Sequence, residues 1–288
     1  MLEVQTIKVD WTALPSGITW YFIGQPKSGK STAASGWSDR GQKCVLVIDT
    51  DLGGDFVDGA NVIAVDYLNT PIRTVTKDGI RVTKSGKPMN EAVPPNERGG
   101  VYRSGPKKGE AMPIYSLSEV VTDLEKNWES YKFDTIVIDT IDKVNEWIED
   151  TVKKELDIKN MGDGQWGADW GMARRKNLDI VRRLQAFCKK VGSDLILISH
   201  SKQTAVQDDK VQLAPALPSG LGRSLCASSD VIGYTTINKE DQSYEISFAG
   251  YDERMIGSRL RPLAQKQLPF NYDSIIDEIK SYKEKGEK

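Results

Sequence analysis

Apolar runs and amphipathic stretches alternate along the chain, which is the pattern of an α/β fold. The runs rich in β-branched and other apolar residues are expected to form buried strands. They cover Ile18 to Ile23, Lys43 to Ile48, Asn61 to Val65, Thr135 to Thr140 and Asp194 to Ile198. Apolar side chains recur at helical spacing in stretches that begin near Leu117, Val144 and Ile180. We therefore expect a mainly parallel central sheet flanked by helices, in a single domain over residues 1–288.

Residues 68–112 interrupt this pattern with polar, turn-rich and locally basic sequence. Thr74 to Thr83 predicts two short strands around the turn Asp78-Gly79, and Pro94 to Gly109 predicts a loop or a partly disordered segment. We interpret 68–112 as an insertion within the domain that contains a β-hairpin. Its excess of lysine and arginine fits a solvated hairpin or a subunit contact as well as it fits a contact with nucleic acid.

A glycine-containing loop follows closely on the first apolar run, and it matches the phosphate-binding pattern G-x-x-x-x-G-K-[ST]. Its glycines allow successive backbone N–H groups to point at a phosphate, while Lys30 is expected to reach the β- and γ-phosphates and Ser31 to ligate Mg²⁺. The sequence therefore predicts a site for ATP and Mg²⁺. The predicted nucleotide-binding residues are Gly24, Gln25, Pro26, Lys27, Ser28, Gly29, Lys30, Ser31 and Thr32.

Two later apolar runs end in carboxylates. Asp49-Thr50-Asp51 follows the second run, and Asp139 ends the run from Thr135 to Thr140. Ligands of open α/β sheets bind at the carboxyl ends of strands, so Asp139 is expected beside the phosphate loop, where it would hold Mg²⁺ through water and Ser31. The alternative is that Asp139 caps the helix that begins near Asp142.

His200, the only histidine, follows the last apolar run. At that strand end it would occupy the place of a γ-phosphate sensor, although a lone histidine is more often structural than catalytic. Farther back, Trp166 and Trp170 are four residues apart and hence on one face if helical. With Arg174 and Arg175 they could stack bases and hold the phosphates of single-stranded DNA, or they could be packing residues beneath the loop.

Overall composition excludes a global positive field, because 39 Lys and Arg oppose 41 Asp and Glu, with a formal net charge of −2. Contacts with nucleic acid must then come from local patches. The three cysteines, Cys44, Cys188 and Cys226, are widely separated and are interpreted as thiols of a reducing compartment. No apolar run approaches the length of a membrane span, so we expect a cytoplasmic protein without a membrane partner.

In their order, these motifs resemble the core of RecA-type recombinases, and most closely the small phage-encoded RecA-like ATPases of single-strand annealing and recombination. The resemblance covers residues 16–262 apart from the insertion, and it implies a RecA-like P-loop NTPase core in the host cytoplasm. It is carried by the phosphate loop, Val45 to Asp51, Ile136 to Thr140, Leu195 to His200 and Ser219 to Arg223.

The resemblance also implies roles for single residues. The carboxylate that activates the attacking water follows the second core strand in this family, which assigns that role to Asp51, with Asp49 and Asp55 as competitors. Asp139 is followed by Thr140 rather than by Glu, so the base must come from elsewhere. His200 occupies the position of the family's polar γ-phosphate sensor.

Further residues correspond to the family's contacts with DNA and with neighbouring subunits. The two loops that face DNA correspond to Lys159 to Gly171 and to Ser201 to Ser219, which contains Lys202. Arg259 and Arg261 correspond to basic residues that reach the neighbouring subunit's nucleotide, unless they are plain surface arginines. These correspondences imply a homo-oligomeric ring or filament on single-stranded DNA, with a single-strand binding protein as a further candidate partner.

The predicted function is a Mg²⁺-dependent ATPase that binds single-stranded DNA and supports phage homologous recombination or annealing. The alternative is an ATP-gated adaptor or loader for a replication or recombination protein, with little DNA affinity of its own. The near-neutral charge and the insertion are compatible with this alternative.

Overall fold

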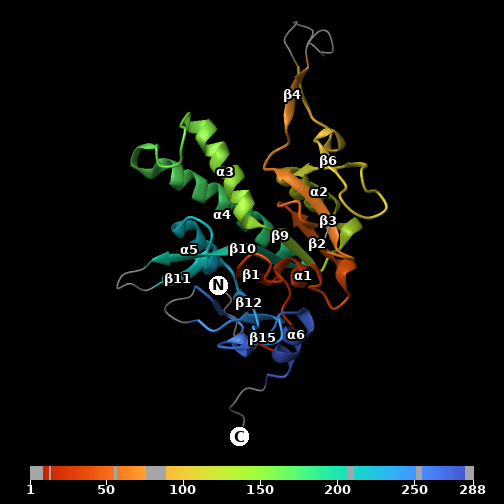
Figure 1. Cartoon of the computed structure of the whole chain (residues 1–288), viewed down its shortest axis with the longest axis vertical. Helices are drawn as coiled ribbons and strands as arrows, with labels where there is room; N and C mark the ends of the chain where they lie inside the picture. Colours follow the sequence, from red (N-terminus) through yellow and green to blue (C-terminus); the bar gives the residue numbers. More distant parts are fainter. Residues whose placement is uncertain are drawn as a thin grey trace, which may run out of the picture.

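The computed structural model describes residues 9–12, 14–54, 57–75, 89–205, 211–250 and 255–282. Their main feature is an 11-stranded sheet whose order is β15-β13-β12-β1-β10-β9-β2-β3-β8, with β11 paired to β10 and β14 to β12 (Figure 1). From β12 to β8 the strands are parallel. The strands are β1 (Thr19–Gly24), β2 (Val45–Asp49), β3 (Asn61–Tyr67), β8 (Tyr115–Ser116), β9 (Thr135–Asp139), β10 (Asp194–Ala205), β11 (Val211–Pro215), β12 (Val231–Ile237), β13 (Tyr244–Ser247), β14 (Gly257–Ser258) and β15 (Gln267–Pro269). The predicted fold class, a mainly parallel sheet flanked by helices, is confirmed.

Both faces of this sheet are covered, which explains why its central strands are continuously apolar. Side chains alternate along β1, so that Tyr21 and Ile23 face one core while Trp20 and Phe22 face the other. The first core packs under α2 (Leu117–Tyr131), α3 (Ile141–Leu156), α4 (Ala168–Val191) and α5 (Ser219–Ser228). The second core packs under α1 (Lys30–Ser35) and α6 (Tyr272–Lys280).

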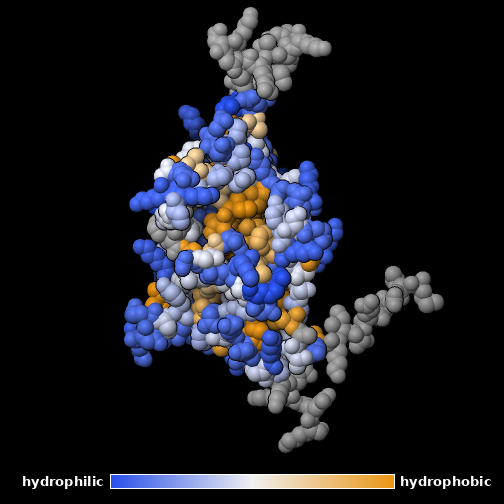
Figure 2. Space-filling model, turned by 90° about the vertical axis from the view of Figure 1, so that its right-hand side faces the viewer, coloured by the Kyte–Doolittle hydropathy of each residue, from blue (hydrophilic) through white to orange (hydrophobic). Residues whose placement is uncertain are grey.

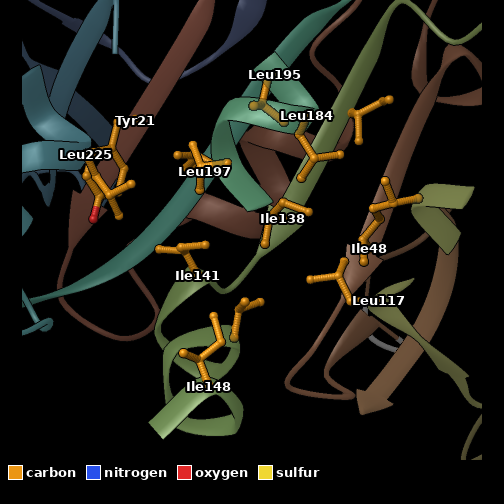
Figure 3. Close-up of a cluster of buried hydrophobic side chains, with 14 of the residues drawn as sticks. Tyr21, Ile48, Leu117, Ile138, Ile141, Ile148, Leu184, Leu195, Leu197 and Leu225 are labelled. Carbon is orange, nitrogen blue, oxygen red and sulfur yellow. The ribbon is translucent and has the colours of Figure 1, made fainter. Parts of the chain in front are cut away.

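The first core shows how strands and helices meet (Figure 3). Ile138 of β9 and Leu197 of β10 lie among Ile141 of α3 and Leu184 of α4, all of them fully buried. This packing fixes the start of α3 directly after the end of β9, which is where the predicted site lies.

The insertion over 68–112 adds two small antiparallel pairs to the edge of the molecule. Strand β4 (Ile72–Val75) pairs with β5 (Met89–Ala92), and β6 (Gly100–Val101) pairs with β7 (Ala111–Met112). The predicted strand pair within Thr74 to Thr83 is therefore wrong in register, because the partner of β4 begins only at Met89. The Asp78-Gly79 turn lies outside the described residues.

The segment from Pro94 to Gly109 consists mainly of turns and irregular backbone, as predicted, apart from one short 3-10 turn and strand β6, and it contains a buried arginine. The side chain of Arg98 is only 1% exposed and forms a bidentate pair with Glu119 of α2, at 2.6 and 2.7 Å. Arg98 also donates to the carbonyls of Val93 and Ile114. A short 3-10 turn, η3 (Pro95–Glu97), precedes it. The pair ties the insertion to α2.

This pair predicts a loss of stability when Glu119 is replaced with glutamine. The hydrogen bonds from Arg98 lower the pKa of Glu119 from 4.5 to about 2. Since the folded state depresses this pKa, the stabilisation is complete above about pH 4.5 and is lost as the pH falls towards 2. Glu119→Gln leaves the Arg98 charge buried and should reduce the free energy of unfolding by about 3 kcal/mol at pH 7.

Urea unfolding at pH 7 and pH 3 measures this effect, and the variant should also show a weaker dependence on acid than the natural chain. Glu129→Gln is the matched control, because Glu129 is 87% exposed and pairs only with the neighbouring Lys132. Equal stability of the two variants at pH 7 would contradict a structural role for the Arg98 pair.

Two segments that were expected to form DNA-facing loops are more ordered than predicted. Residues from Ser201 onward continue β10 and pair with β11, so the loop predicted over Ser201 to Ser219 is largely a β-hairpin. Trp166 lies in the 3-10 turn η4 (Gln165–Gly167) with φ of 57°, while α4 begins only at Ala168. Trp166 and Trp170 therefore do not share one helical face, because the left-handed turn at Trp166 and Gly167 precedes the helix.

Two remaining expectations concern cysteines and membranes. All three cysteines are free thiols, with Cys188 and Cys226 buried and Cys44 partly exposed. Within the described ranges, no helix has the length and apolar character needed to cross a bilayer.

Candidate functional site

Strand register brings the predicted site residues together at the carboxyl edge of the sheet. Strand β10 lies between β1 and β9, so that Gly24 pairs with His200 and Ile198 pairs with Asp139. On the other side of β9, Asp139 pairs with Asp49. Strands β1, β9 and β2 thus end side by side, while β10 passes between β1 and β9 and continues into the hairpin. The cavity at this edge has a volume of about 240 Å³. Its lining includes Lys30, Ser31, Thr32, Asp49, Asp51, Asp139, Thr140 and His200.

The phosphate loop has the backbone that its glycines predicted. Gly29 has φ of 79°, in the left-handed region, and α1 begins at the next residue. Lys30 is 5% exposed, and its Nζ donates to the carbonyls of Gly24 and Gln25 at 3.1 and 2.7 Å. Burial lowers the pKa of Lys30 to about 8, while Asp139 and Asp142 act in the opposite direction. The ammonium group of Lys30 is thus held inside the loop, where it can donate a hydrogen bond to an anion and neutralise part of its charge.

Tyr244 is a site residue that sequence reasoning missed. It belongs to β13, lines the same cavity and lies against the phosphate loop: a Cβ added to Gly29 would be 2.6 Å from its Cγ. Gly29 is thus required both by its φ and by this ring. Nothing in the local sequence of β13 indicates the contact, which depends on the pairing of β13 with β12.

Ser31 and Asp139, the predicted metal-ligand pair, both line the cavity. Burial raises the pKa of Asp139 to about 6, with smaller contributions in the same direction from Asp49 and Asp51, whereas Ser31 and Lys30 lower it. The capping alternative is not supported, because Thr140 rather than Asp139 is the N-cap residue of α3. A buried carboxylate crowded by others favours a cation beside it.

The oxygen atoms of Ser31 and Asp139 are suitable ligands for Mg²⁺ bound together with a nucleotide. Mg²⁺ prefers oxygen ligands and is usually bound by one or two carboxylates together with substrate phosphates and water. Within the part of the chain that the structure describes, no cluster of three or more His, Cys, Asp or Glu could hold a metal ion alone. Ser31 and Asp139 would therefore supply the protein ligands.

Asp49 and Asp51 differ in what their carboxylates contact. Asp49 is 5% exposed and accepts hydrogen bonds from the backbone N–H groups of Gly53 and Gly54, at 3.1 and 2.7 Å. Asp51 is exposed in the cavity and accepts one long hydrogen bond, from the Thr140 hydroxyl at 3.3 Å. Burial raises the pKa of both carboxyl groups. Asp49 thus stabilises the following loop, and Asp51 is free to contact a ligand; Asp55 lies outside the described residues.

His200 has a buried partner that the sequence analysis did not assign. Its Nδ1 lies 3.0 Å from Oδ2 of Asp142, in the first turn of α3. The hydrogen bond with Asp142 raises the pKa of His200, and burial acts against it. Only the spacing of Asp142, one turn into the helix after the Asp139 strand, could have indicated this contact.

The residues predicted to bind DNA lie apart from this cavity, along α4 and the hairpin. Trp166 is fully exposed, and Trp170 is 40% exposed. Trp170 and Arg174 line a second cavity of about 410 Å³ between α3, α4 and α5, and Arg174 donates to the Ser224 hydroxyl at 2.7 Å. Lys202 donates to the Leu217 carbonyl and so braces the hairpin. The remaining member of the set, Arg175, is exposed on α4.

The arginines predicted to act on a neighbouring subunit lie near the amino ends of the strands. Arg259 pairs with Asp230 at 2.9 Å and donates to the Ala227 carbonyl. Asp230 directly precedes β12 and accepts from the Thr19 backbone N–H, at the opposite end of β1 from the phosphate loop. Arg261 begins the short turn η5 (Arg261–Leu263). Neither lines the nucleotide cavity of its own chain, and their role in a neighbour's site stays a prediction.

Comparison with known proteins gives one finding. The family model described as "AAA domain" matches residues 16–261, which contain the phosphate loop and Asp49, Asp51, Asp139 and His200 of the cavity. No curated protein matches the chain.

Proposed function

Because the chain belongs to the AAA domain family, whose domains bind and hydrolyse nucleotides at a phosphate loop, we propose that it is a Mg²⁺-dependent ATPase that binds single-stranded DNA. The observation that carries the ATPase part is the single cavity lined by Lys30, Asp51, Asp139 and His200. These are the residue types that phosphoryl transfer requires: a cation for the phosphates, an acidic metal ligand, a base and a polar sensor.

In this proposal each side chain has one task. The Nζ of Lys30 leaves the loop carbonyls and contacts the β- and γ-phosphate oxygens, where its charge counters the negative charge that develops. Asp51 orients the attacking water and accepts its proton, and His200 contacts the γ-phosphate. Ser31 and Asp139 would hold Mg²⁺, which would supply positive charge to the phosphates.

The DNA-binding part is supported by the surface along α4. Trp166 lies on a tight turn with its indole entirely in solvent, so that the faces of its ring are open to stacking on a base. Aromatic rings beside arginines bind single strands by stacking on bases while the arginines contact phosphates. Arg174 and Arg175 lie about two turns into α4, which begins two residues after Trp166.

Trp166→Ala should therefore weaken binding of a fluorescently labelled single strand by about 1–3 kcal/mol, with little change in the salt dependence of binding. A double Arg174→Ala, Arg175→Ala variant should instead flatten the salt slope, because it removes phosphate contacts. Tyr131→Ala is the matched control, since Tyr131 is an exposed aromatic residue on α2. Unchanged affinity in the Trp166 variant would remove Trp166 from the DNA site.

The proposal extends to a homo-oligomer, ring or filament, because Arg259 and Arg261 can serve a nucleotide only in another copy. Particle mass measured with and without an ATP analogue and a single strand tests this part. A constant monomer would exclude both the oligomer and the trans-acting arginines. A role in phage recombination or annealing, with a single-strand binding protein as partner, is the biological setting in which such an ATPase would act.

A second candidate, an ATP-gated adaptor or loader, is favoured by an apolar groove between β3 and α2. The groove has a volume of about 770 Å³ and is lined by Ile63, Tyr115, Leu124 and Phe133, among others. Figure 2 shows an apolar hollow on this side of the molecule. Apolar hollows of this kind often mark contacts with other proteins. If the chain binds ATP but no single strand at low salt, the adaptor is the better account.

A further inference from the structure

Asp142 connects helix α3 to strand β10 beside the nucleotide cavity. It lies in the first turn of α3, and its side chain is 14% exposed. Its Oδ1 accepts from the Ser199 hydroxyl at 2.5 Å. Its Oδ2 accepts from the His200 backbone N–H at 2.7 Å and contacts the His200 ring at 3.0 Å. One carboxylate thus holds two consecutive residues at the point where β10 leaves the sheet.

These contacts determine the state of the imidazole. A carboxylate only accepts hydrogen bonds, so the Nδ1 atom that faces it must carry a hydrogen. That leaves Nε2 as the nitrogen that can contact a ligand in the cavity, which His200 lines. Nε2 donates a hydrogen bond to a phosphate oxygen when the ring carries a hydrogen on both nitrogens, the form that the adjacent Asp142 carboxylate favours. Two further charged groups act on the ring, Asp51 after β2 and Lys30 of α1, with opposite effects.

His200 also lies at the start of the β10–β11 hairpin. The His200 carbonyl accepts from the Ala216 backbone N–H at 2.7 Å, and the β10–β11 pairing starts at Ser201 with Pro215. The ring of His200 therefore faces the cavity, its N–H is held by α3, and its carbonyl is held by the hairpin.

We propose that Asp142 is the positioning residue that fixes the orientation and tautomer of His200 for contact with the γ-phosphate, and that this contact is coupled to the β10–β11 hairpin. The inference rests on the proposed nucleotide site. In this proposal the position of the His200 ring depends on Asp142 of α3 as well as on strand β10. Loss of the γ-phosphate then changes the contacts of both α3 and the hairpin at one point.

His200 is the only histidine in the chain, so an untagged, ¹⁵N-labelled protein gives one imidazole in a long-range ¹H–¹⁵N spectrum. The natural chain should show the Nδ1–H tautomer and titrate above the ordinary value of about 6.5. Asp142→Asn should lower the titration midpoint by about one pH unit, because the opposite charge is lost. Turnover should fall about tenfold with a smaller change in KM, because binding by the phosphate loop remains.

Asp150→Asn on the same helix is the control and should change none of these values, since Asp150 lies on the exposed side and pairs with Lys153. An Nε2–H tautomer or a midpoint at or below 6.5 in the natural chain would overturn the proposal, even if Asp142→Asn does not fold. An unchanged midpoint and tautomer in a folded Asp142→Asn would also overturn it.

Coupling to the nucleotide has its own test. A non-hydrolysable ATP analogue should shift the His200 signal, and it should also shift the amide signals of residues 201–205, whereas ADP should leave both near their ligand-free positions. If the analogue binds by calorimetry but moves neither set, the sensor role is wrong. If no nucleotide binds at all, the proposed function fails, and the tautomer measurement still decides whether Asp142 positions the ring.

Discussion

Lys30→Ala should weaken the binding of Mg²⁺-ATP by about 100-fold, equivalent to about 2.7 kcal/mol. The reason is that Lys30 is the buried cation of the phosphate loop, with its Nζ held by the Gly24 and Gln25 carbonyls. Alanine leaves those carbonyls facing the phosphates without a positive charge between them. Calorimetry measures the affinity, and circular dichroism establishes that the variant is folded.

The pH dependence of binding provides a second test of the same residue. In the ligand-free chain the pKa of Lys30 is lowered to about 8, mainly by burial. Phosphate oxygens favour the charged form and raise this pKa, so binding should take up protons near pH 8, and affinity should fall as the pH rises above 8. Calorimetry in two buffers of different ionisation enthalpy measures the uptake.

Lys153→Ala is the matched control for Lys30→Ala, because Lys153 lies on α3 and pairs with Asp150. It should retain the affinity and the proton uptake of the natural chain. A Lys30→Ala chain that is folded and binds ATP as tightly as Lys153→Ala would show that the nucleotide lies elsewhere.

Asp51→Asn should lower turnover by about 100-fold while ATP affinity changes little. An amide cannot accept the proton of the attacking water, yet it keeps the size of the side chain and the contact with Thr140. Turnover and affinity must therefore be measured separately, by phosphate release and by calorimetry. Asp51→Glu should retain more activity than Asp51→Asn, because it keeps the carboxylate.

The Asp49→Asn variant distinguishes the role of Asp49 from that of Asp51. It would place an amide NH₂ against one of the two backbone N–H groups that Asp49 binds, so it should lower the melting temperature rather than remove only the chemical step. Asp55→Asn belongs in the same series. A folded, inactive Asp49→Asn or Asp55→Asn chain, beside an active Asp51→Asn chain, would move the role of the base away from Asp51.

Local sequence was sufficient to predict the site residues that lie on the phosphate loop and just after apolar runs. The phosphate loop is a contiguous pattern, and Asp139 ends the run from Thr135, so both could be placed beside each other once a parallel sheet was expected. His200 was placed by the same reasoning, since it follows the next apolar run, although β10 continues through it to Ala205. For Asp49 and Asp139 the apolar run defines the strand and the acidic residue marks its carboxyl end.

Residues that reach the cavity from other elements could not be found in this way. Tyr244 arrives through the antiparallel strand β13, and Asp142 arrives one turn into a helix, where an acidic residue is ordinary. The choice between Asp49 and Asp51 depends on the backbone N–H groups of Gly53 and Gly54, which are visible only in three dimensions.

The errors in the fold have equally specific causes. The hairpin after His200 is polar, so its pairing has no periodic apolar signal, and Pro215 suggested a loop. The loop around Arg98 was expected but the burial of its arginine was not, because that burial depends on one ion pair with α2. The two tryptophans were separated by a positive φ at Trp166 that spacing alone does not indicate.

Release of inorganic phosphate from ATP by the purified chain is the decisive measurement for ATP hydrolysis at the phosphate loop. We expect turnover that requires Mg²⁺, stops when the metal is chelated, and is lost in Lys30→Ala. ATP hydrolysis at this loop is excluded if the folded natural chain releases no phosphate with Mg²⁺, with or without single-stranded DNA, or if Lys30→Ala releases phosphate as fast as the natural chain.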